Sequence, residues 1–373
     1  MYSETISKLM ASLILSPLIA PTAFAQFDDG ARYAFIPSAS SQSILVIDLQ
    51  EQSLAHTIEL TRAPSSVAAS ERLKALVIGH AADRSMTLID LSTSALERFH
   101  YPLSLTPSTI AMSPVGETVA IFDDETGRLE VHAIRRRAVL LSVGDVRTDS
   151  GFTFSADGAT LFWVDDSKGT LNSVDLWSET RVIELTQPGS GLSAISRSID
   201  GTVAFVSEAS ANVVHMIDLK TFAPLLKIHV GSRPGRPWGT ADGRYMLVPN
   251  NGDRSLTAIS TATGASLYTV PAVSHPLFIN PGWLDTTAAV VSESGHVVFI
   301  DIDDGSVTAR YELNGAPLDG IVTSDSRTLA IPVPENGSVE FFDMRNRNRS
   351  SSIRNLPLDI GPAALAISNN LCH

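Results

Sequence analysis

A short phrase of sequence recurs along this chain at an almost constant interval. Ser85 to Ser92 reads Ser-Met-Thr-Leu-Ile-Asp-Leu-Ser, in which apolar and polar residues alternate before an Asp. The final Asp recurs at Asp48, Asp90, Asp175, Asp218, Asp301 and Asp343, and Ala133 and Ser260 stand at the two missing positions of the series. Successive positions are 42, 43, 42, 43, 42, 41 and 42 residues apart. A period of about 40 to 45 residues built from short strands is typical of a β-propeller blade.

Each period contains four strand-like runs. A run such as Ala75 to Gly79 leads through a polar loop into the Asp-terminated run, a third run such as Leu225 to Val230 follows, and a fourth ends in a tight turn. The turns begin with Ser or Thr and end in Gly, at Ser113–Gly116, Ser155–Gly158, Ser198–Gly201 and Thr240–Gly243. Such turns favour hairpins because Gly tolerates positive φ. Four strands per period, with no amphipathic helix between them, predict an all-β propeller.

The number of runs gives the number of blades. Runs of the first type begin near Tyr33, Ala75, Val119, Leu161, Ala204, Met246, Ala289 and Leu329. Runs of the fourth type begin near Pro64, Pro107, Gly151, Leu192, Pro237, Pro276, Leu318 and Pro362. We expect the lone last run, Ala363 to Ser368, to pair with the three N-terminal strands, which closes the ring and leaves no open sheet edge. The prediction is eight four-stranded blades, with seven as the alternative if the last repeat is only a cap.

The first residues have the pattern of an export signal. Lys8 precedes the apolar run Leu9 to Ile19, and Ala23-Phe24-Ala25 offers small residues where a signal peptidase cleaves. We therefore expect a signal peptide over residues 1–25, cleavage after Ala25, and one propeller domain over residues 26–373. No later stretch reaches the length of a membrane span. The expected location is the bacterial periplasm or the exterior, with a periplasmic protein or a small molecule as partner.

The charge of the chain argues against nucleic-acid binding. The net charge is −13, and the one basic run, Arg135 to Arg137, lies between apolar residues and is interpreted as a solvated turn. An acidic chain without a basic stripe is a poor ligand for nucleic acids or anionic membranes. Cys372 is the single cysteine, so no intramolecular disulfide forms and stability must come from packing.

The turns and the Asp series resemble those of the YVTN-type β-propeller repeat family, within the cytochrome d1-like and quinoprotein-associated propeller superfamily. In that family a Ser-Pro-Asp-Gly turn, a strand and a strand ending in Ile-Asp recur with this period. The resemblance covers essentially the whole chain after residue 25. An eight-bladed periplasmic member is similar to the haem-d1-binding propellers of nitrite respiration, and seven-bladed relatives include lactonases. The shared motif residues are architectural, so the resemblance implies a fold and assigns no functional residue.

Polar residues also recur at the loop between the first and second runs, where a channel mouth would lie. The leading residue of this loop, ten before the Asp position, is His80, Asp123, Asp165, Glu208 and Asn250 in five successive blades. Three interpretations remain open: a metal site, a negative rim for a cationic partner, and plain solvated turns. The Asp series itself is interpreted as architectural, because an Asp that ends a strand can accept hydrogen bonds from the amides of the next turn.

Residues that occur in only one blade are the better candidates for a binding site. Arg233-Pro-Gly-Arg-Pro-Trp238 and the segment from His275 to Trp283 lead into two of the fourth runs. Guanidinium groups and an indole suit a carboxylate, a phosphate or a planar cofactor. The predicted ligand-binding residues are His80, Arg233, Arg236, Trp238 and His275. In the alternative interpretation Trp238 and Trp283 pack between blades and the arginines are solvated.

Three functions remain open on the sequence. The first is a binding or accessory propeller that presents one channel mouth to a small ligand, a cofactor or a partner protein. The second is a metal- or haem-handling propeller, for which the ligand candidates are His80, His275, Cys372 and His373. The third is a lactonase-type hydrolase. No catalytic motif is present, no catalytic residue is assigned, and the cofactor is unknown.

Overall fold

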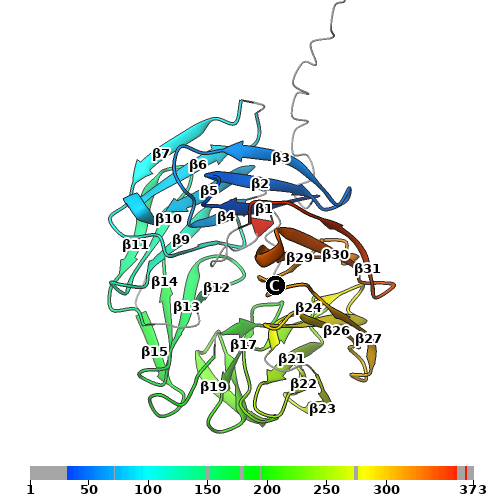
Figure 1. Cartoon of the computed structure of the whole chain (residues 1–373). Helices are drawn as coiled ribbons and strands as arrows, with labels where there is room; N and C mark the ends of the chain where they lie inside the picture. Colours follow the sequence, from blue (N-terminus) through cyan, green and yellow to red (C-terminus); the bar gives the residue numbers. More distant parts are fainter. Residues whose placement is uncertain are drawn as a thin grey trace, which may run out of the picture.

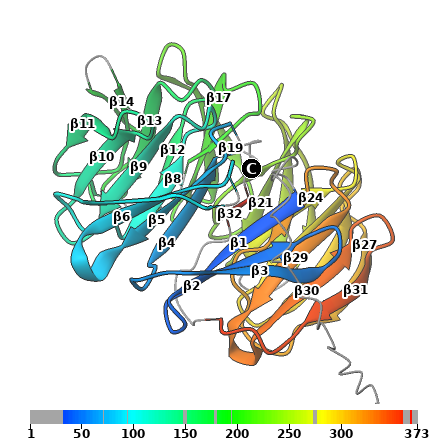
Figure 2. The same cartoon turned by 90° about the horizontal axis from the view of Figure 1, so that it is seen from above.

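The described residues form eight four-stranded antiparallel sheets, arranged in a ring as the blades of one propeller (Figure 1). The computed structural model describes residues 32–70, 72–93, 95–147, 151–176, 180–193, 195–272, 276–358 and 366–367. Figure 2 shows the same ring from a second direction, with the strands of each blade side by side. The predicted all-β propeller of eight blades is confirmed, and the alternative of seven blades is wrong.

Each blade begins with its innermost strand at the channel and ends with its outermost strand at the rim. In that order, blades 1 to 4 are β32 (Ala366–Ile367), β1 (Tyr33–Ser38), β2 (Ser43–Asp48) and β3 (Ser53–Glu59); β4 (Ser66–Ser70), β5 (Ala75–His80), β6 (Ser85–Asp90) and β7 (Arg98–Pro102); β8 (Thr109–Met112), β9 (Thr118–Asp123), β10 (Arg128–Ala133) and β11 (Ala138–Val143); β12 (Phe152–Phe154), β13 (Thr160–Asp165), β14 (Thr170–Asp175) and β15 (Thr180–Glu184).

Blades 5 to 8 follow the same order. They are β16 (Ser196–Arg197), β17 (Val203–Glu208), β18 (Val213–Asp218) and β19 (Ala223–His229); β20 (Trp238–Gly239), β21 (Tyr245–Asn250), β22 (Ser255–Ser260) and β23 (Ser266–Pro271); β24 (Pro276–Gly282), β25 (Thr287–Ser292), β26 (His296–Asp301) and β27 (Val307–Glu312); β28 (Ile321–Val322), β29 (Thr328–Val333), β30 (Ser338–Asp343) and β31 (Asn348–Ile353). Two short 3-10 turns, η2 (Ala81–Asp83) and η3 (Pro334–Asn336), lie in loops.

The two ends of the fold share blade 1. Strand β32 pairs with β1 in an antiparallel register, with Ala34 opposite Ile367 and Phe35 opposite Ala366. Figure 1 shows the red β32 beside the blue β1. This pairing is the predicted closure of the ring. It covers the inner edge of β1, which the first three strands alone would leave unpaired.

The two faces of the ring carry different connections. We call one face the loop face. It carries the loops between second and third strands, such as 251–254, which are the loops between first and second runs of the sequence. It also carries the segments that lead into the innermost strands, such as 230–237. These two kinds of segment meet, because the Asn251 amide donates to the Arg233 carbonyl at 3.0 Å. The opposite face, called the turn face, carries tight turns such as Thr240–Gly243.

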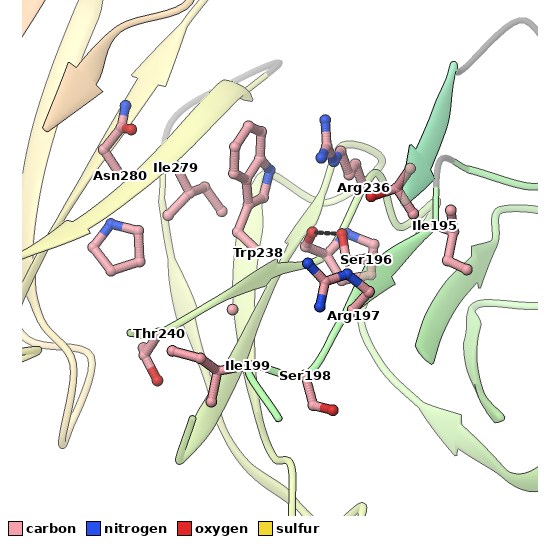
Figure 3. Close-up of a pocket in the computed structure, with 14 residues that line it drawn as sticks. Ile195, Ser196, Arg197, Ser198, Ile199, Arg236, Trp238, Thr240, Ile279 and Asn280 are labelled. Atoms are coloured by element: carbon pink, nitrogen blue, oxygen red, sulfur yellow. Dashed lines mark hydrogen bonds between the residues drawn. The ribbon is translucent and has the colours of Figure 1, made fainter. Parts of the chain in front are cut away.

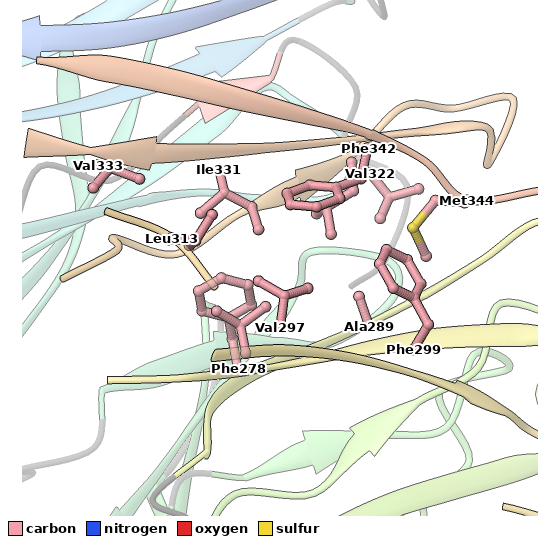
Figure 4. Packing of buried hydrophobic residues seen from close by; sticks show 12 residues of the cluster. Phe278, Ala289, Val297, Phe299, Leu313, Val322, Ile331, Val333, Phe342 and Met344 are labelled. Atoms are coloured by element: carbon pink, nitrogen blue, oxygen red, sulfur yellow. The ribbon is translucent and has the colours of Figure 1, made fainter. Parts of the chain in front are cut away.

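The core lies between the blades rather than within one sheet. All six residues of β5 and of β25 are buried, because each middle strand is covered on both sides by neighbouring blades. Between blades 7 and 8, the aromatic rings of Phe278, Phe299 and Phe342 pack together with aliphatic residues from both sheets (Figure 4). Burying large apolar side chains is the main favourable contribution to folding.

The recurring Asp residues close the turns that follow the third strands. Their side chains accept hydrogen bonds from backbone amides two or three residues later, at 2.8 to 3.0 Å, in five blades: Asp48, Asp90, Asp218, Asp301 and Asp343. This is the Asx-turn role predicted from the sequence. The series is therefore architectural in those five blades.

A second recurring position went unrecognised in the sequence. The residue before each third strand has a left-handed backbone, with φ between 49° and 84°, at Gln42, Arg84, Gly127, Gly169, Asn212, Arg254, Gly295 and Gly337. In all eight blades its carbonyl accepts a hydrogen bond, at 2.7 to 3.1 Å, from an amide in the segment after the outermost strand. This bond directs the chain back toward the channel after every blade.

One turn departs from the pattern on the turn face. In blade 6 the turn is Thr240–Gly243, whereas blade 7 has Gly-Trp-Leu-Asp at the matching positions 282–285. Trp283, Leu284 and Asp285 have φ values of 45°, 55° and 54°, which costs roughly 1–2 kcal/mol per residue. The Asp285 carboxylate accepts hydrogen bonds from the amides of Ala241 at 2.9 Å and of Asp242 at 2.7 Å. The strained turn thereby ties blade 7 to blade 6.

Candidate functional site

A pocket opens in the wall of the channel, between the innermost strands of four neighbouring blades. Its lining comes from β12, β16, β20 and β24 and includes Arg197, Arg236, Trp238 and Asn280. Figure 3 shows Trp238 between Asn280 and Arg236, with the Arg197 guanidinium on the same side of the indole as Arg236. The free volume is about 70 Å³. That is room for a few water molecules or one carboxylate or oxyanion group.

Arg236 supplies a cation in this pocket. Its guanidinium carbon lies 4.7 Å from the centre of the Trp238 ring, a cation–π contact that fixes both side chains. The side chain is exposed to solvent, although neighbouring protein removes part of its hydration. The pKa of Arg236 is lowered, mainly by this loss of hydration, while the negative charge of Asp319 acts in the opposite sense. Partial loss of hydration likewise raises the pKa of the exposed Asp319, against the effect of Arg236.

The rest of the lining mixes polar and apolar residues and contains no carboxylate. Asn280 is 8% exposed, and its Nδ2 has no hydrogen-bond partner among the residues that the structure describes. Ser196 donates its hydroxyl hydrogen bond to the Pro237 carbonyl, which ties β16 to the start of β20 (Figure 3). Two arginines and an unused amide donor therefore face a space with no acidic lining residue, and the carboxylates whose charges act on these arginines, Asp319 and Asp157, lie outside the lining. Such a set of donors suits an anion.

Among the other predicted residues that the structure describes, Arg233 does not join this pocket. Arg233 is exposed and lies outside the lining, and its backbone amide donates to the Asn212 side-chain oxygen at 2.9 Å. His275 lies outside the described residues. Both predicted tryptophans, Trp238 and Trp283, pack in part against the core between blades 7 and 8, as the alternative interpretation stated. Of the predicted set, the structure places only Arg236 and Trp238 in the pocket.

His80 corrects the sequence-based prediction. It is 1% exposed, so the prediction of an accessible ligand at the channel mouth is wrong. Nδ1 lies 3.0 Å from the Ala63 carbonyl and Nε2 lies 2.8 Å from the Thr87 hydroxyl, which occupies both ring nitrogens. Burial lowers the pKa of His80, and the neutral ring suits this environment. His80 is a buried structural residue because it ends a strand instead of beginning an exposed loop.

The acidic members of the same series are also buried, so the predicted negative rim is wrong for them. Asp123 is 2% exposed and accepts hydrogen bonds from the amides of Thr106, Glu125 and Thr126. Glu208 is 5% exposed and pairs with the buried His215 at 2.9 Å. These carboxylates organise the loops and present no surface charge to a partner.

The remaining metal-ligand candidates stay predictions. Cys372 and His373, like His275, lie outside the described residues. Within the described part of the chain, no group of three His, Cys, Asp or Glu side chains is arranged to hold a metal ion. The channel-wall pocket is lined by two arginines, serine and threonine hydroxyls, an asparagine amide and apolar residues, and its lining holds no His, Asp or Glu. No helix in the described ranges has the length and apolar character of a membrane span.

Comparison with known proteins adds to the description of the fold. No protein-family model and no curated protein sequence matches the chain. Among solved structures, dihydro-heme d1 dehydrogenase NirN in complex with DHE matches 92% of this chain and 76% of its own, with a TM-score of 0.72 and 14% identity. AztD from Citrobacter koseri matches 90% and 96%, with a TM-score of 0.62 and 14% identity.

A third match is BamB from Moraxella catarrhalis, over 80% of this chain and 92% of its own, with a TM-score of 0.57 and 15% identity. These identities are too low to carry over a function, so the likeness concerns the fold alone. The chain is a β-propeller protein of eight blades. The finer YVTN assignment stays a prediction from the sequence.

Proposed function

We propose that this protein is an exported binding propeller, whose channel-wall pocket holds a small anionic ligand through Arg236 and Arg197. The observation that carries the proposal is the lining of the pocket. Two arginines and no carboxylate line it, although the protein as a whole has a net charge of −13. In a chain with a net negative charge, charges placed at random would more often put carboxylates than arginines in the pocket lining.

The chemistry of the pocket narrows the ligand to a carboxylate or an oxyanion. A guanidinium offers a planar fork of N–H donors that matches either group, and its charge makes those hydrogen bonds strong. The cation–π contact with Trp238 holds Arg236 in place before the ligand arrives, which lowers the entropic cost of binding. On the other side of the indole, Asn280 offers its unused amide donor to a ligand that carries a second acceptor.

Export is the second part of the proposal, and residues 1–25 support it. Lys8, the apolar run Leu9 to Ile19 and Ala23-Phe24-Ala25 have the order of a signal peptide. The test is the N-terminal mass of the protein recovered from the periplasm or medium. We expect a chain that begins at Gln26, and a protein that keeps Met1 inside the cell would contradict export.

Ligand binding is tested by calorimetry on the purified protein with acetate, succinate, sulfate and phosphate as probes. We expect saturable binding of at least one probe, weakened at least tenfold in Arg236→Gln. Succinate favoured over acetate would indicate a dicarboxylate that reaches Asn280, whereas phosphate favoured over both would indicate an oxyanion. Arg233→Gln is the matched control, because it removes the same charge from the same segment outside the pocket. Equal affinities of both variants and the wild type would contradict the site.

The metal- or haem-handling alternative has a separate test. An absorption spectrum and elemental analysis of the protein from its native compartment report directly on a bound haem or metal. A stoichiometric metal or a haem band would favour the metal- or haem-handling function, with His275, Cys372 and His373 as the candidate ligands. NirN, the structure in complex with DHE, shares the fold with this chain at 14% identity, which is a reason to make the measurement.

A further inference from the structure

A larger cleft lies on the turn face, between blades 3 and 4, and shares no lining residue with the channel-wall pocket. Its volume is about 440 Å³, within the range of clefts that bind small organic molecules. It is lined by the turn before β9, the turn after β10, strand β11 and the turn before β13. The basic run Arg135 to Arg137, interpreted from the sequence as a solvated turn, forms one side.

Two of these arginines are uncommitted cations. Arg135 and Arg136 are exposed, line the cleft and form no ion pair or side-chain hydrogen bond within the described part of the chain. Arg137 differs, because its guanidinium carbon stacks 4.1 Å from the centre of the Phe99 ring. The turn is therefore anchored at Arg137 and presents the other two guanidinium groups to the cleft.

The two carboxylates of the lining are already engaged. Glu117 forms an ion pair with Arg72 at 2.9 Å. Asp157 accepts hydrogen bonds from the Ser155 hydroxyl at 2.5 Å and from the Ala159 amide at 3.0 Å. The Ser155 hydrogen bond is the main reason that the pKa of Asp157 is lowered. Neither carboxylate forms an ion pair with Arg135 or Arg136, so these two guanidinium groups stay available at one side of the cleft.

The other walls of the cleft are apolar. Val115, Leu140, Ala159 and Leu176 line it, and Leu140 and Leu176 are continuous with the core cluster of blades 3 and 4. The Thr118 hydroxyl oxygen is buried in the lining and has no partner among the described residues. The cleft thus offers an apolar surface, one unused hydroxyl and two cations at one side.

We propose that this cleft binds an amphipathic carboxylate, with its apolar body on Leu140 and Leu176 and its carboxylate on Arg135 and Arg136. The chemistry is that of a medium-chain fatty acid. An apolar body suits the leucine surface of the cleft, and an anionic head suits Arg135 and Arg136, which form no ion pair within the described residues. The site shares no lining residue with the channel-wall pocket and does not depend on the proposed function.

The test is calorimetry of the purified protein with decanoate, below the concentration at which decanoate forms micelles. We expect saturable binding at one site and a loss of at least tenfold in affinity in the double variant R135Q/R136Q. The matched control, R310Q/R354Q, removes the same charge from two exposed arginines outside the cleft and keeps the affinity of the wild type. Decylamine, with the same body and the opposite charge, should bind at least tenfold more weakly.

Three outcomes would overturn the proposal. They are absence of saturable decanoate binding, equal affinity in R135Q/R136Q and the wild type, and equal binding of decylamine and decanoate. Binding of an acidic peptide but not of decanoate would also overturn it, since the occupant would then be a protein segment. Circular dichroism melting of each variant checks that the fold is intact.

Discussion

The loops between second and third strands are alike around the whole ring, whereas the innermost strands of blades 5 to 7 differ from one another. In each loop, one left-handed residue offers its carbonyl to the chain that returns to the channel, and this bond occurs in all eight blades. The channel wall instead carries Arg197, Arg236, Trp238 and Asn280 once each. Recurring positions therefore hold the ring together, and single-copy positions give it a site.

This difference has a physical basis in how a propeller is built. Every blade must return its chain to the axis and bury both faces of its middle strands, so each blade needs the same bonds. A ligand needs only one set of donors, and the scaffold can place that set on any blade. Substitutions at the two kinds of position should consequently affect different measurements: stability for the recurring ones, binding for the others.

The largest effect is expected at a recurring glycine. Gly169 has φ +69°, and a Cβ there would lie 2.3 Å from the Thr186 carbonyl oxygen. Gly169→Val should lower the free energy of unfolding by roughly 2–5 kcal/mol, through left-handed strain and overpacking. Urea unfolding measures it. Gly144→Val is the control, because nothing lies within 4 Å of its Cβ position. Equal urea midpoints of unfolding for Gly169→Val and Gly144→Val would contradict the structural role of the recurring glycine.

Acid should lower the stability of the fold, because two histidines, His80 and His215, are buried. Burial lowers the pKa of His80 and of His215 from the ordinary 6.5, so the unfolded chain takes up protons more readily than the folded one. Stability is then fully present above about pH 6.5 and decreases as the pH falls below it. Melting temperatures at pH 7.5, 6.5 and 5.5 should show this fall, and a smaller fall in H80Q/H215Q. A profile unchanged in that variant would assign the acid sensitivity to other groups.

A smaller loss of stability is expected at the Asp series. Asp343 accepts hydrogen bonds from the amides of Arg345 at 2.8 Å and Asn346 at 2.9 Å. Asp343→Ala should cost about 1 kcal/mol, the usual effect of removing such a capping acceptor. Chemical unfolding of Asp343→Ala beside Glu59→Ala, an exposed acidic residue on a strand edge, measures it. A larger loss in the Glu59 variant would contradict the architectural role of the series.

The smallest effect on stability is expected at the single-copy site. Arg236→Gln removes the cation–π contact with Trp238 and should change the free energy of unfolding by no more than about 1 kcal/mol. The same substitution should remove most anion binding. A variant that unfolds several kcal/mol more easily would show that Arg236 is structural, and the contrast between the two regions would then disappear.

The fold could be predicted from the sequence because its signals recur. Eight runs of each type, the Asp series and the Gly-terminated turns gave the blade number and the closure through β32. The left-handed loop position was missed for a physical reason. The hydrogen-bonded loop imposes this conformation on residue types that do not normally indicate it. Besides four glycines, the residues that adopt it are Gln42, Arg84, Asn212 and Arg254.

The site was predictable only in part. Arg236 and Trp238 stood out because they interrupt the repeat, but Arg233 in the same segment lies outside the pocket. Asn280 gave one usable signal, a polar residue between Ile279 and Pro281 in an innermost strand, and burial without a partner is visible only in three dimensions. His80 was placed wrongly because spacing locates a residue along the chain and does not tell whether it ends a strand or begins a loop.

The central claim is that the channel wall holds an anion at Arg236 and Arg197. It is tested most directly by a crystal structure of the protein soaked in selenate, a tetrahedral oxyanion that selenium's anomalous scattering makes visible. We predict an anomalous peak in the channel-wall pocket, within hydrogen-bond distance of the Arg236 guanidinium, that is absent from Arg236→Gln crystals. A well-ordered pocket without such a peak, at selenate concentrations that label other arginines of the same crystal, would contradict the claim.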